Sequence, residues 1–181
     1  TATADGVDIR NNMVTVTRTG TGPKYGIFMN TNTTVFTSNF NNFYVTGDNS
    51  HVGFSSTINR TTLAEWQAAT SQDANSLTVD PIYASPATGN FTPIFPPVDN
   101  TGTPVGVVDD INGAVRSLTT PDIGAYEFAV PPCQAPPAVG SATAVPSSGF
   151  CLGTPILLSL NGYQFGGGQT YQWEFSTSAG G

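Results

Sequence analysis

Short β-rich segments separated by Asn, Gly and Thr constrain most strongly what the first 80 residues can fold into. The strand signals fall at residues 6–10, 13–17, 25–29, 34–37 and 42–45. Hairpins joined by two-residue turns would space such strands regularly, but these gaps are uneven. Uneven spacing favours a parallel solenoid, in which each coil runs several short strands around one core. An antiparallel sandwich with Asn-rich loops is the alternative.

Two Asn pairs recur in this region, at residues 11–12 and 41–42. Asn tolerates the left-handed backbone conformation, and its side-chain amide bonds to backbone groups. Stacked Asn residues would therefore turn successive coils at a shared corner.

One segment, residues 61–70, carries a helical signal. Thr61 or Thr62 can cap its start, and Glu65 lies three positions after Thr62, as in a capping box. Leu63, Trp66 and Ala69 recur at the spacing of one helix face. We expect Trp66 to pack against the solenoid, because large apolar residues on a helix face are usually buried. An exposed Trp66 that stacks on a sugar is the alternative.

Residues 82–104 are rich in Pro and cannot form a regular central strand. We expect this stretch to be a loop that covers the open end of the solenoid, where unpaired strand edges would invite aggregation. Phe91, Ile94 and Phe95 are the side chains expected to fill the core there.

The stretch 109–128 closes the first part of the chain and reads D-D-I-N-G-A-V-R-S-L-T-T-P-D-I-G-A-Y-E-F. Asn112 and Gly113 predict a tight turn, and Pro121 with Asp122 predicts a second one. Residues 123–128 alternate and predict a final short strand that carries large aromatic side chains.

This stretch carries a resemblance. The pattern D-I-x-G-x-x-R followed by P-D-I-G-A-Y-E-F resembles the closing motif of secreted bacterial right-handed parallel β-helix proteins associated with type IX secretion. The earlier run T-L-x-x-W-Q-x-x-T-x-Q-D-A-N-S-L-x-x-D-P resembles the same family, in which it forms a short helix beside the last coils. The resemblance implies that residues 1–128 are the C-terminal coils and capping loop of such a β-helix. It also implies an extracellular or cell-surface location, with the secretion machinery as a partner during export.

Residues 129–132, A-V-P-P, predict a linker, and the composition changes after it. Strand signals follow at 142–145, 156–160 and 170–175. Their order resembles the start of an immunoglobulin-like repeat of large surface proteins, in which Trp173 would fill the core. Residues 133–181 supply only about half of such a domain. The predicted fold is therefore all-β, a parallel β-helix followed by an incomplete immunoglobulin-like sandwich.

The chain has two cysteines, Cys133 and Cys151. A zinc site lacks further ligands, since the single histidine, His51, is far away in sequence. Two free thiols stay an open alternative. The extracellular composition favours a disulfide, which would stabilise the fold by roughly 3 kcal/mol in the chain-entropy model.

Charged residues make up only 9% of the chain, and the net charge is −7. An acidic chain repels phosphate backbones, so nucleic acid is excluded as a partner. No apolar run is long enough to span a membrane. The sequence also begins in the middle of a strand pattern, so we expect it to be a piece of a longer protein.

A calcium ion is the one cofactor that these residues could hold. Asp109, Asp110, Asn112 and Asp122 could offer hard oxygen ligands around one turn. The spacing of an EF-hand is absent, and turn formation explains the same residues equally well.

Catalytic residues are not evident in the sequence. Hydrolysis of a polysaccharide needs two facing carboxyl groups, and lyases usually need a basic residue near metal-binding carboxylates. Most Asp residues instead lie beside Asn, Gly or Pro, where turns use them, and the chain has only five Lys and Arg residues. His51 has no Ser or Cys nucleophile in a recognisable frame.

The sequence therefore predicts a non-catalytic structural or adhesive segment, an adhesin-like part of a large modular protein that contacts polysaccharide, cells or a substratum. The alternative is the C-terminal part of a β-helix polysaccharide lyase or hydrolase whose active site lies upstream. Clustered Asp or Glu with Lys or Arg on upstream coils would favour the enzyme, and further repeats would favour the adhesin.

Overall fold

The computed structural model describes residues 5–30, 35–130, 140–145, 147–149 and 155–162. The chain divides into two compact units, Thr1–Ala129 and Val130–Gly181. Strands outnumber helices among the described elements, so the all-β prediction is confirmed at that level.

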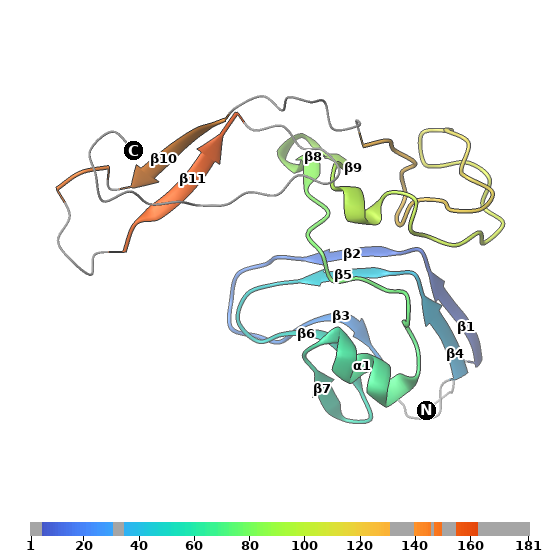
Figure 1. The fold of residues 1–181 in the computed structure, drawn as a ribbon. Coiled ribbons are helices and arrows are strands. Elements are labelled where there is room, and N and C mark those ends of the chain that lie inside the picture. The colour runs from blue at the N-terminus through green and yellow to red at the C-terminus, as the bar shows by residue number, and fades with distance from the viewer. Residues whose placement is uncertain (1–4, 31–34, 131–139, 146, 150–154, 163–181) are drawn as a thin grey trace. The chain divides into compact units, whose positions relative to one another are not determined.

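The first unit contains two successive passes of three strands each. The first pass holds β1 (Asp5–Arg10), β2 (Met13–Val16) and β3 (Lys24–Phe28). The second pass holds β4 (Val35–Asn39), β5 (Asn42–Val45) and β6 (Ser50–Ser55). β1 pairs with β4, β2 with β5 and β3 with β6, in parallel each time (Figure 1). The antiparallel-sandwich alternative is therefore wrong for these strands.

The register between the passes is nearly constant. Val14 lies opposite Phe43, 29 positions later in the chain. Tyr25 lies opposite His51, 26 positions later, because the loop between β2 and β3 is three residues longer than the loop between β5 and β6. The guanidinium of Arg18 donates to two backbone carbonyls at the end of the longer loop, at 3.3 and 2.7 Å, and so holds the extra residues in place.

The corner that follows β1 and β4 is built from left-handed residues and a buried amide. Asn11 (φ 57°) and Phe40 (φ 55°) take the same backbone conformation, one in each pass. Asn41 is fully buried; its Oδ1 accepts the N–H of Asn12 at 2.9 Å, and its Nδ2 donates to the carbonyl of Ile9 at 2.8 Å. The predicted Asn corner is thus right in part, since Phe40 rather than an Asn is left-handed in the second pass.

A buried carboxylate ties this corner to the chain that follows. Asp73 is 1% exposed, and it accepts hydrogen bonds from Nε1 of Trp66 (2.7 Å), Nδ2 of Asn41 (3.0 Å) and Oγ of Ser76 (2.6 Å). The backbone of Leu77 then pairs with the second pass on both sides of Asn42. The chain after the helix therefore begins a third pass against β5.

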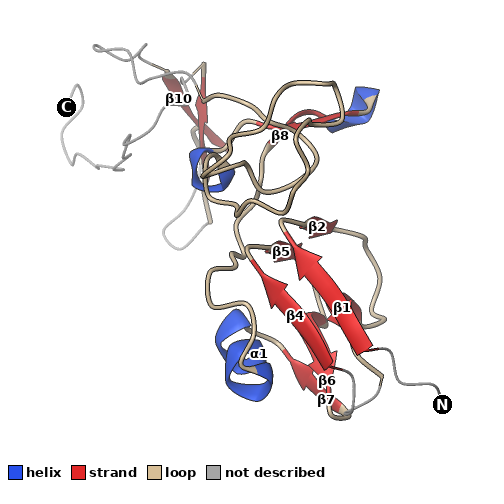
Figure 2. Ribbon diagram, turned by 90° about the vertical axis from the view of Figure 1, so that its right-hand side faces the viewer, coloured by secondary structure: helices blue, strands red, loops and turns tan. Residues whose placement is uncertain are grey.

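The helix α1 (Leu63–Thr70) follows the short strand β7 (Ile58–Arg60), which pairs antiparallel with β6. Its predicted capping box is confirmed. Thr62 is the N-cap and accepts the N–H of Glu65, while the Glu65 carboxylate accepts the N–H of Thr62 at 3.1 Å. Figure 2 shows α1 beside the strands of the second pass.

Trp66 is the side chain that α1 contributes to the core. It is fully buried, and it forms one cluster with Phe43 and Val52. Gly53 faces its ring so closely that a Cβ there would lie 2.4 Å from Cε3 of Trp66. The indole therefore needs a residue without a side chain opposite it.

The Pro-rich stretch contains a hairpin of β8 (Tyr83–Ser85) and β9 (Asn90–Pro93), with 3-10 turns at Pro86–Thr88 and Pro96–Val98. The expectation that Phe91, Ile94 and Phe95 fill the core is wrong. Phe91 is 49% exposed and meets Tyr83 edge to face, and none of the three joins the core cluster, where Trp66 packs instead.

Of the two turns predicted in the closing stretch, the one at Asn112 and Gly113 is confirmed, and none forms at Pro121 and Asp122. The predicted strand is also absent. Gly113 has φ 81°, as the turn at 111–113 requires. Residues 123–128 form no strand, because Gly124 (φ 107°) bends the chain so that its N–H bonds the carbonyl of Asn11 at 2.9 Å. Ile123 next to it is fully buried.

The second unit contains one described sheet, the antiparallel pair of β10 (Ser141–Val145) and β11 (Leu157–Asn161). Both strands begin within one residue of their predicted positions. The predicted strand at 170–175 lies outside the described residues, so the immunoglobulin-like assignment stays a prediction. No helix in the described part of the chain has the length and apolar character needed to cross a membrane.

We expect Gly53→Ala to destabilise the first unit by about 1–3 kcal/mol or more, because the new methyl group overlaps the ring of Trp66. Gly22→Ala is the matched control, since a Cβ at Gly22 would lie 3.7 Å from the nearest atom, on the Arg18 side chain. Urea unfolding of the full chain measures both. Equal stability of the two variants would contradict the packing of Trp66 on Gly53.

We expect Asp73→Ala to cost roughly 3 kcal/mol or more of unfolding free energy, because three buried donors lose their acceptor together. Asp48→Ala removes an exposed carboxylate and should change stability by less than about 0.5 kcal/mol. Thermal unfolding followed by Trp fluorescence compares the two. A loss at Asp73 no larger than at Asp48 would contradict the buried network.

Candidate functional site

Asp110, one of the predicted calcium ligands, organises the turn of the closing motif. Its Oδ1 accepts the N–H of Asn112 at 2.7 Å and that of Ala114 at 2.8 Å, and its Oδ2 accepts the N–H of Glu127 at 3.0 Å. These hydrogen bonds lower the pKa of Asp110 below its ordinary value, and the bond from the N–H of Glu127 has the largest effect. The carboxylate is therefore occupied by backbone donors.

Asp122, the second carboxylate of the motif, is 1% exposed. Its Oδ1 accepts the N–H of Asn100 and its Oδ2 accepts the N–H of Phe128, both at 2.6 Å. Burial raises the pKa of Asp122 to about 6, against the lowering effect of these two bonds. Asp122 thus ties the last residue of the closing stretch to Asn100 in the Pro-rich stretch.

Arg116 and Glu127 complete the same network. The Arg116 guanidinium donates to the carbonyls of Asp122 (3.1 Å) and Gly124 (2.6 Å), and it lies 3.5 Å from the Glu127 carboxylate. Glu127 accepts the N–H groups of Ser117 and Asp122. Asp110, Arg116, Asp122 and Glu127 therefore hold the closing stretch in its conformation through bonds to the backbone and through the Arg116–Glu127 ion pair. This gives the motif a structural role.

The predicted calcium ligands are brought near one another only in part. Asp110 and Asp122 both contact Glu127, whereas Asp109 and Asn112 are exposed. Among the described residues, no group of three or more His, Cys, Asp or Glu side chains is arranged to hold a metal ion. The contacts of Asp110 and Asp122 follow the turn-forming interpretation of these residues.

Trp66 does not present its ring to solvent. The side chain is fully buried and its Nε1 is bonded to Asp73, so a sugar has no access to either ring face. The alternative that Trp66 stacks on a sugar is therefore wrong. Cys133 and Cys151 lie outside the described residues, and the disulfide stays a prediction.

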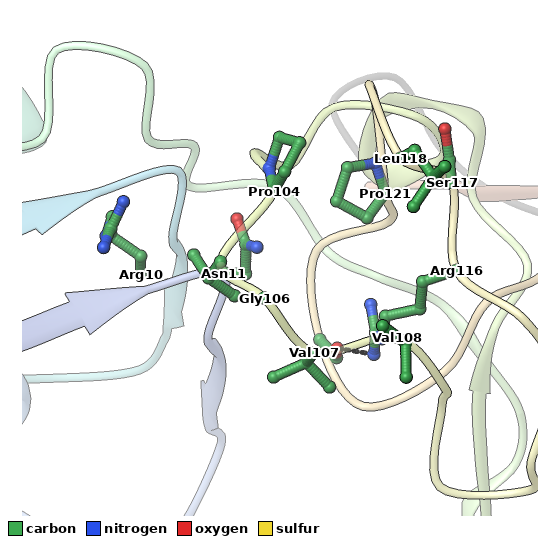
Figure 3. Close-up of a pocket in the computed structure, with 12 residues that line it drawn as sticks. Arg10, Asn11, Pro104, Gly106, Val107, Val108, Arg116, Ser117, Leu118 and Pro121 are labelled. Carbon is green, nitrogen blue, oxygen red and sulfur yellow. Dashed lines mark hydrogen bonds between the residues drawn. The ribbon is translucent and has the colours of Figure 1, made fainter.

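A mostly apolar cavity of about 250 Å³ opens beside the closing network (Figure 3). Its walls come from Arg10, from Asn11, from residues 104–108 and from the loop that begins at Arg116. Figure 3 shows Arg116 extending toward the valines of the facing wall. Arg10 is paired with Asp8 and Arg116 with Glu127, so both cations at this cavity are already neutralised.

A cluster of aromatic side chains lies on β3 and β6: Tyr25, Phe28 and Phe54. Together with Asn59 of the neighbouring β7 we name them the aromatic surface. The rings of Phe28 and Phe54 stack in parallel, 5° apart in plane, with centroids at 4.5 Å. Tyr25 meets both rings edge to face at 5.2 and 5.8 Å, and its hydroxyl donates to Oδ1 of Asn59 at 2.9 Å. Phe28 is 53% exposed.

Sequence reasoning did not find the aromatic surface, because Phe54 and Asn59 lie in strands that the pattern did not predict. The signal that could have found it is the repeat at 26 positions, which places an aromatic ring at residues 25 and 51 and again at 28 and 54. Comparison of the chain with protein-family models, curated proteins and solved structures gives no match. Function is therefore inferred from the residues of the chain itself.

We expect the side-chain carboxyl of Asp122 to titrate with a midpoint near pH 6 in the folded chain. Since the ordinary value is 3.8, the stability that depends on protonation of Asp122 is complete below about pH 4 and is lost as the pH rises through 6. Carbon NMR of the carboxyl groups between pH 3 and 8 measures this. Asp110 is the internal control, with a midpoint below 3.8. A midpoint for Asp122 at or below 3.8 would overturn the argument from burial.

Proposed function

We propose that this chain is a non-catalytic structural and adhesive segment of a large secreted or cell-surface modular protein. In this proposal, residues 1–128 are the C-terminal coils and cap of a right-handed parallel β-helix, and residues 133–181 begin an immunoglobulin-like repeat. The observation that carries it is the parallel pairing of three strand pairs at offsets of 26–30 residues.

Stacked parallel passes suit a load-bearing column. Each strand satisfies its backbone groups with the strand of the next pass, and the neighbouring strands lie about 4.8 Å apart. Connections between parallel strands of one sheet are almost always right-handed, which supports that hand for the coil. Among the described residues, β1, β2 and β3 pair only on the side of the second pass, so further parallel strands would add on their other side.

A non-catalytic role is supported by what five of the described carboxylates do. Asp8 pairs with Arg10, Glu65 caps α1, and Asp73 binds the indole of Trp66. Asp110 and Asp122 bind backbone N–H groups of the closing stretch. Carboxylates that already accept several internal hydrogen bonds are poor general acids or bases for a bound substrate.

An adhesive role is supported by the aromatic surface and by the low charge of the chain. Exposed aromatic rings bury a large apolar area when a partner covers them, and the amide and hydroxyl groups beside them supply hydrogen bonds. Charged residues are 9% of this chain, and none of the residues of the aromatic surface carries a charge. Polysaccharide and the surfaces of cells or substrata are the partners that this chemistry suits.

The export route and location are part of the same proposal. The closing motif resembles that of secreted β-helix proteins, and the composition suits an extracellular protein. A disulfide between Cys133 and Cys151 and export by type IX secretion are both proposed on that ground.

We expect beads that carry the full chain to be retained on polysaccharide-coated surfaces, without cleavage of the polysaccharide. The panel contains neutral polysaccharides (cellulose, mixed-linkage glucan, mannan) and acidic ones (pectate, alginate). Retention under flow measures adhesion, and assays for reducing ends and for unsaturated products measure cleavage. Beads that carry an unrelated acidic protein are the control.

Release of reducing ends or of unsaturated products would contradict the non-catalytic role and favour a lyase or hydrolase. Retention no greater than that of the control beads on every surface would contradict the adhesive role.

A further inference from the structure

We propose that a groove between the outer face of the β2–β5 sheet and the β8–β9 hairpin binds neutral polysaccharide. This inference rests on the proposed adhesive function and assigns its contact site. The groove consists of two adjoining hollows of about 460 and 620 Å³, and Met13, Tyr83 and Phe91 line both of them. We name it the hairpin groove. Because the two hollows share these residues, a ligand longer than one sugar can extend from one into the other.

The floor of the hairpin groove is the outer face of the β2–β5 sheet. Phe43 lies in the core cluster, and Val14 packs against it. Since side chains alternate along a strand, Met13, Thr15 and Tyr44 point away from the core. Figure 1 shows β8 and β9 on this outer side of β2. A further parallel strand beside β2 would continue the sheet about 4.8 Å away and leave this face open, so the groove is compatible with further passes.

The wall of the groove is the β8–β9 hairpin, which a side-chain bond holds beside the sheet. The hydroxyls of Tyr83 on β8 and Thr15 on β2 share a hydrogen bond at 2.8 Å. Phe91 on β9 meets the Tyr83 ring with the centroids at 5.4 Å and the planes 85° apart. An edge-to-face contact covers at most one face of the Phe91 ring, and no other described ring stacks on it.

Phe91 therefore offers a ring face to a ligand. Its side chain is 49% exposed and lies in the lining of both hollows. A pyranose ring presents a face of C–H groups, and such groups pack on the negative face of an aromatic ring. The hydrogen bond of Tyr83 to Thr15 holds the hairpin before a ligand arrives, and a preorganised site loses little entropy on binding.

The hollow of about 620 Å³ brings polar groups to the same ligand as the Phe91 ring. Four further residues of its lining have polar side chains: Thr15, Thr17, Tyr44 and Asp80. The Tyr44 hydroxyl donates to the Asp80 carboxylate, and this bond raises the pKa of Tyr44. Asp80 is exposed, and its remaining lone pairs can accept sugar hydroxyls. One sugar chain in this hollow therefore contacts both the ring and the carboxylate.

The hollow of about 460 Å³ extends the groove toward the closing stretch. Its lining includes the exposed Asn12, from the corner after β1, and Tyr126 from the closing motif. Gly124 (φ 107°) bends the chain here, and residues 124–126 all line this hollow. An amide and a second aromatic ring therefore lie beyond Phe91 for the next sugars of a chain.

Charge selects neutral sugars over acidic ones. Asp80 is the only charged residue among those that line the two hollows. No cation in this lining offsets its repulsion of uronate or sulfate groups, and the net charge of −7 adds to that repulsion. The cavity of Figure 3 has no aromatic ring in its lining, so it lacks the stacking partner that a sugar needs.

A proline-rich peptide is the other ligand that packs on aromatic-lined grooves. Its pyrrolidine rings carry no hydroxyl groups and its prolines no N–H. They would leave the Asp80 carboxylate and the hydroxyls of Thr15 and Thr17 without new partners. Each sugar of a neutral polysaccharide carries several hydroxyls, so the lining favours the sugar.

The test measures the affinity of the full chain for the neutral polysaccharides of the panel by affinity electrophoresis and calorimetry. Phe91→Ala should weaken binding by about tenfold or more, since the stacking face is lost, while Phe91→Tyr should retain it. Asp80→Ala should weaken it by several-fold. Phe28→Ala is the matched control, because Phe28 is 53% exposed and lines neither hollow. Thermal unfolding of each variant shows that it is folded, and Asp80→Ala decides alone if Phe91→Ala does not fold.

Loss of affinity in Phe91→Ala and Asp80→Ala, with unchanged affinity in Phe91→Tyr and Phe28→Ala, supports the hairpin groove. Binding of neutral polysaccharide that Phe91→Ala leaves unchanged overturns the groove and leaves the adhesive function standing, as does binding of acidic polysaccharide alone. Binding of poly-L-proline in place of neutral polysaccharide also overturns it. Binding of no polysaccharide on the panel overturns the groove, and retention of the coated beads on cells then decides the adhesive function separately.

Discussion

The parallel pairing of backbone groups between successive passes is the constraint on which the rest of this structure depends. Parallel strands cannot be joined by a tight turn, so each strand must find its partner a full pass later in the chain. The corners between strands must then satisfy their own polar groups without help from a sheet. Asn41 and Asp73 do this in the interior, where the Asn41 amide bonds two backbone groups of the first pass and Asp73 binds Asn41.

This arrangement puts polar groups where most small domains place apolar ones. The buried apolar cluster is small, with Phe43, Val52 and Trp66 at its centre, and fully buried Asn41 and Asp73 lie beside it. Such a network stabilises a fold only when every member is satisfied, which ties the indole of Trp66 to one orientation. The closing stretch uses the same kind of network: Nη1 and Nη2 of Arg116 donate to the carbonyls of Asp122 and Gly124, while its buried Nε has no hydrogen-bond partner among the described residues.

The parts of the fold that could be predicted from the sequence are those set by neighbouring residues. The capping box of Thr62 and Glu65 and the turn at Gly113 follow from local hydrogen bonds, and the β-branched segments marked most strands. β6 was missed because S-H-V-G-F-S has few β-forming residues and becomes a strand by pairing with β3. The strand expected at 123–128 failed because Gly124 bonds Asn11, a contact that no local pattern contains. The aromatic surface could not be predicted either, because Phe54 lies on β6 and contacts Phe28 only when the two passes pair in register.

The strand register between the passes is the measurement that tests this account most directly. Nuclear Overhauser contacts between backbone protons report which residues of β2 and β5 face each other and whether the strands run in the same direction. The account predicts contacts at an offset of 29, between Val14 and Phe43 and between Thr15 and Tyr44, in the pattern of parallel strands. Close Hα–Hα contacts between the same strands, which mark antiparallel neighbours, would contradict it.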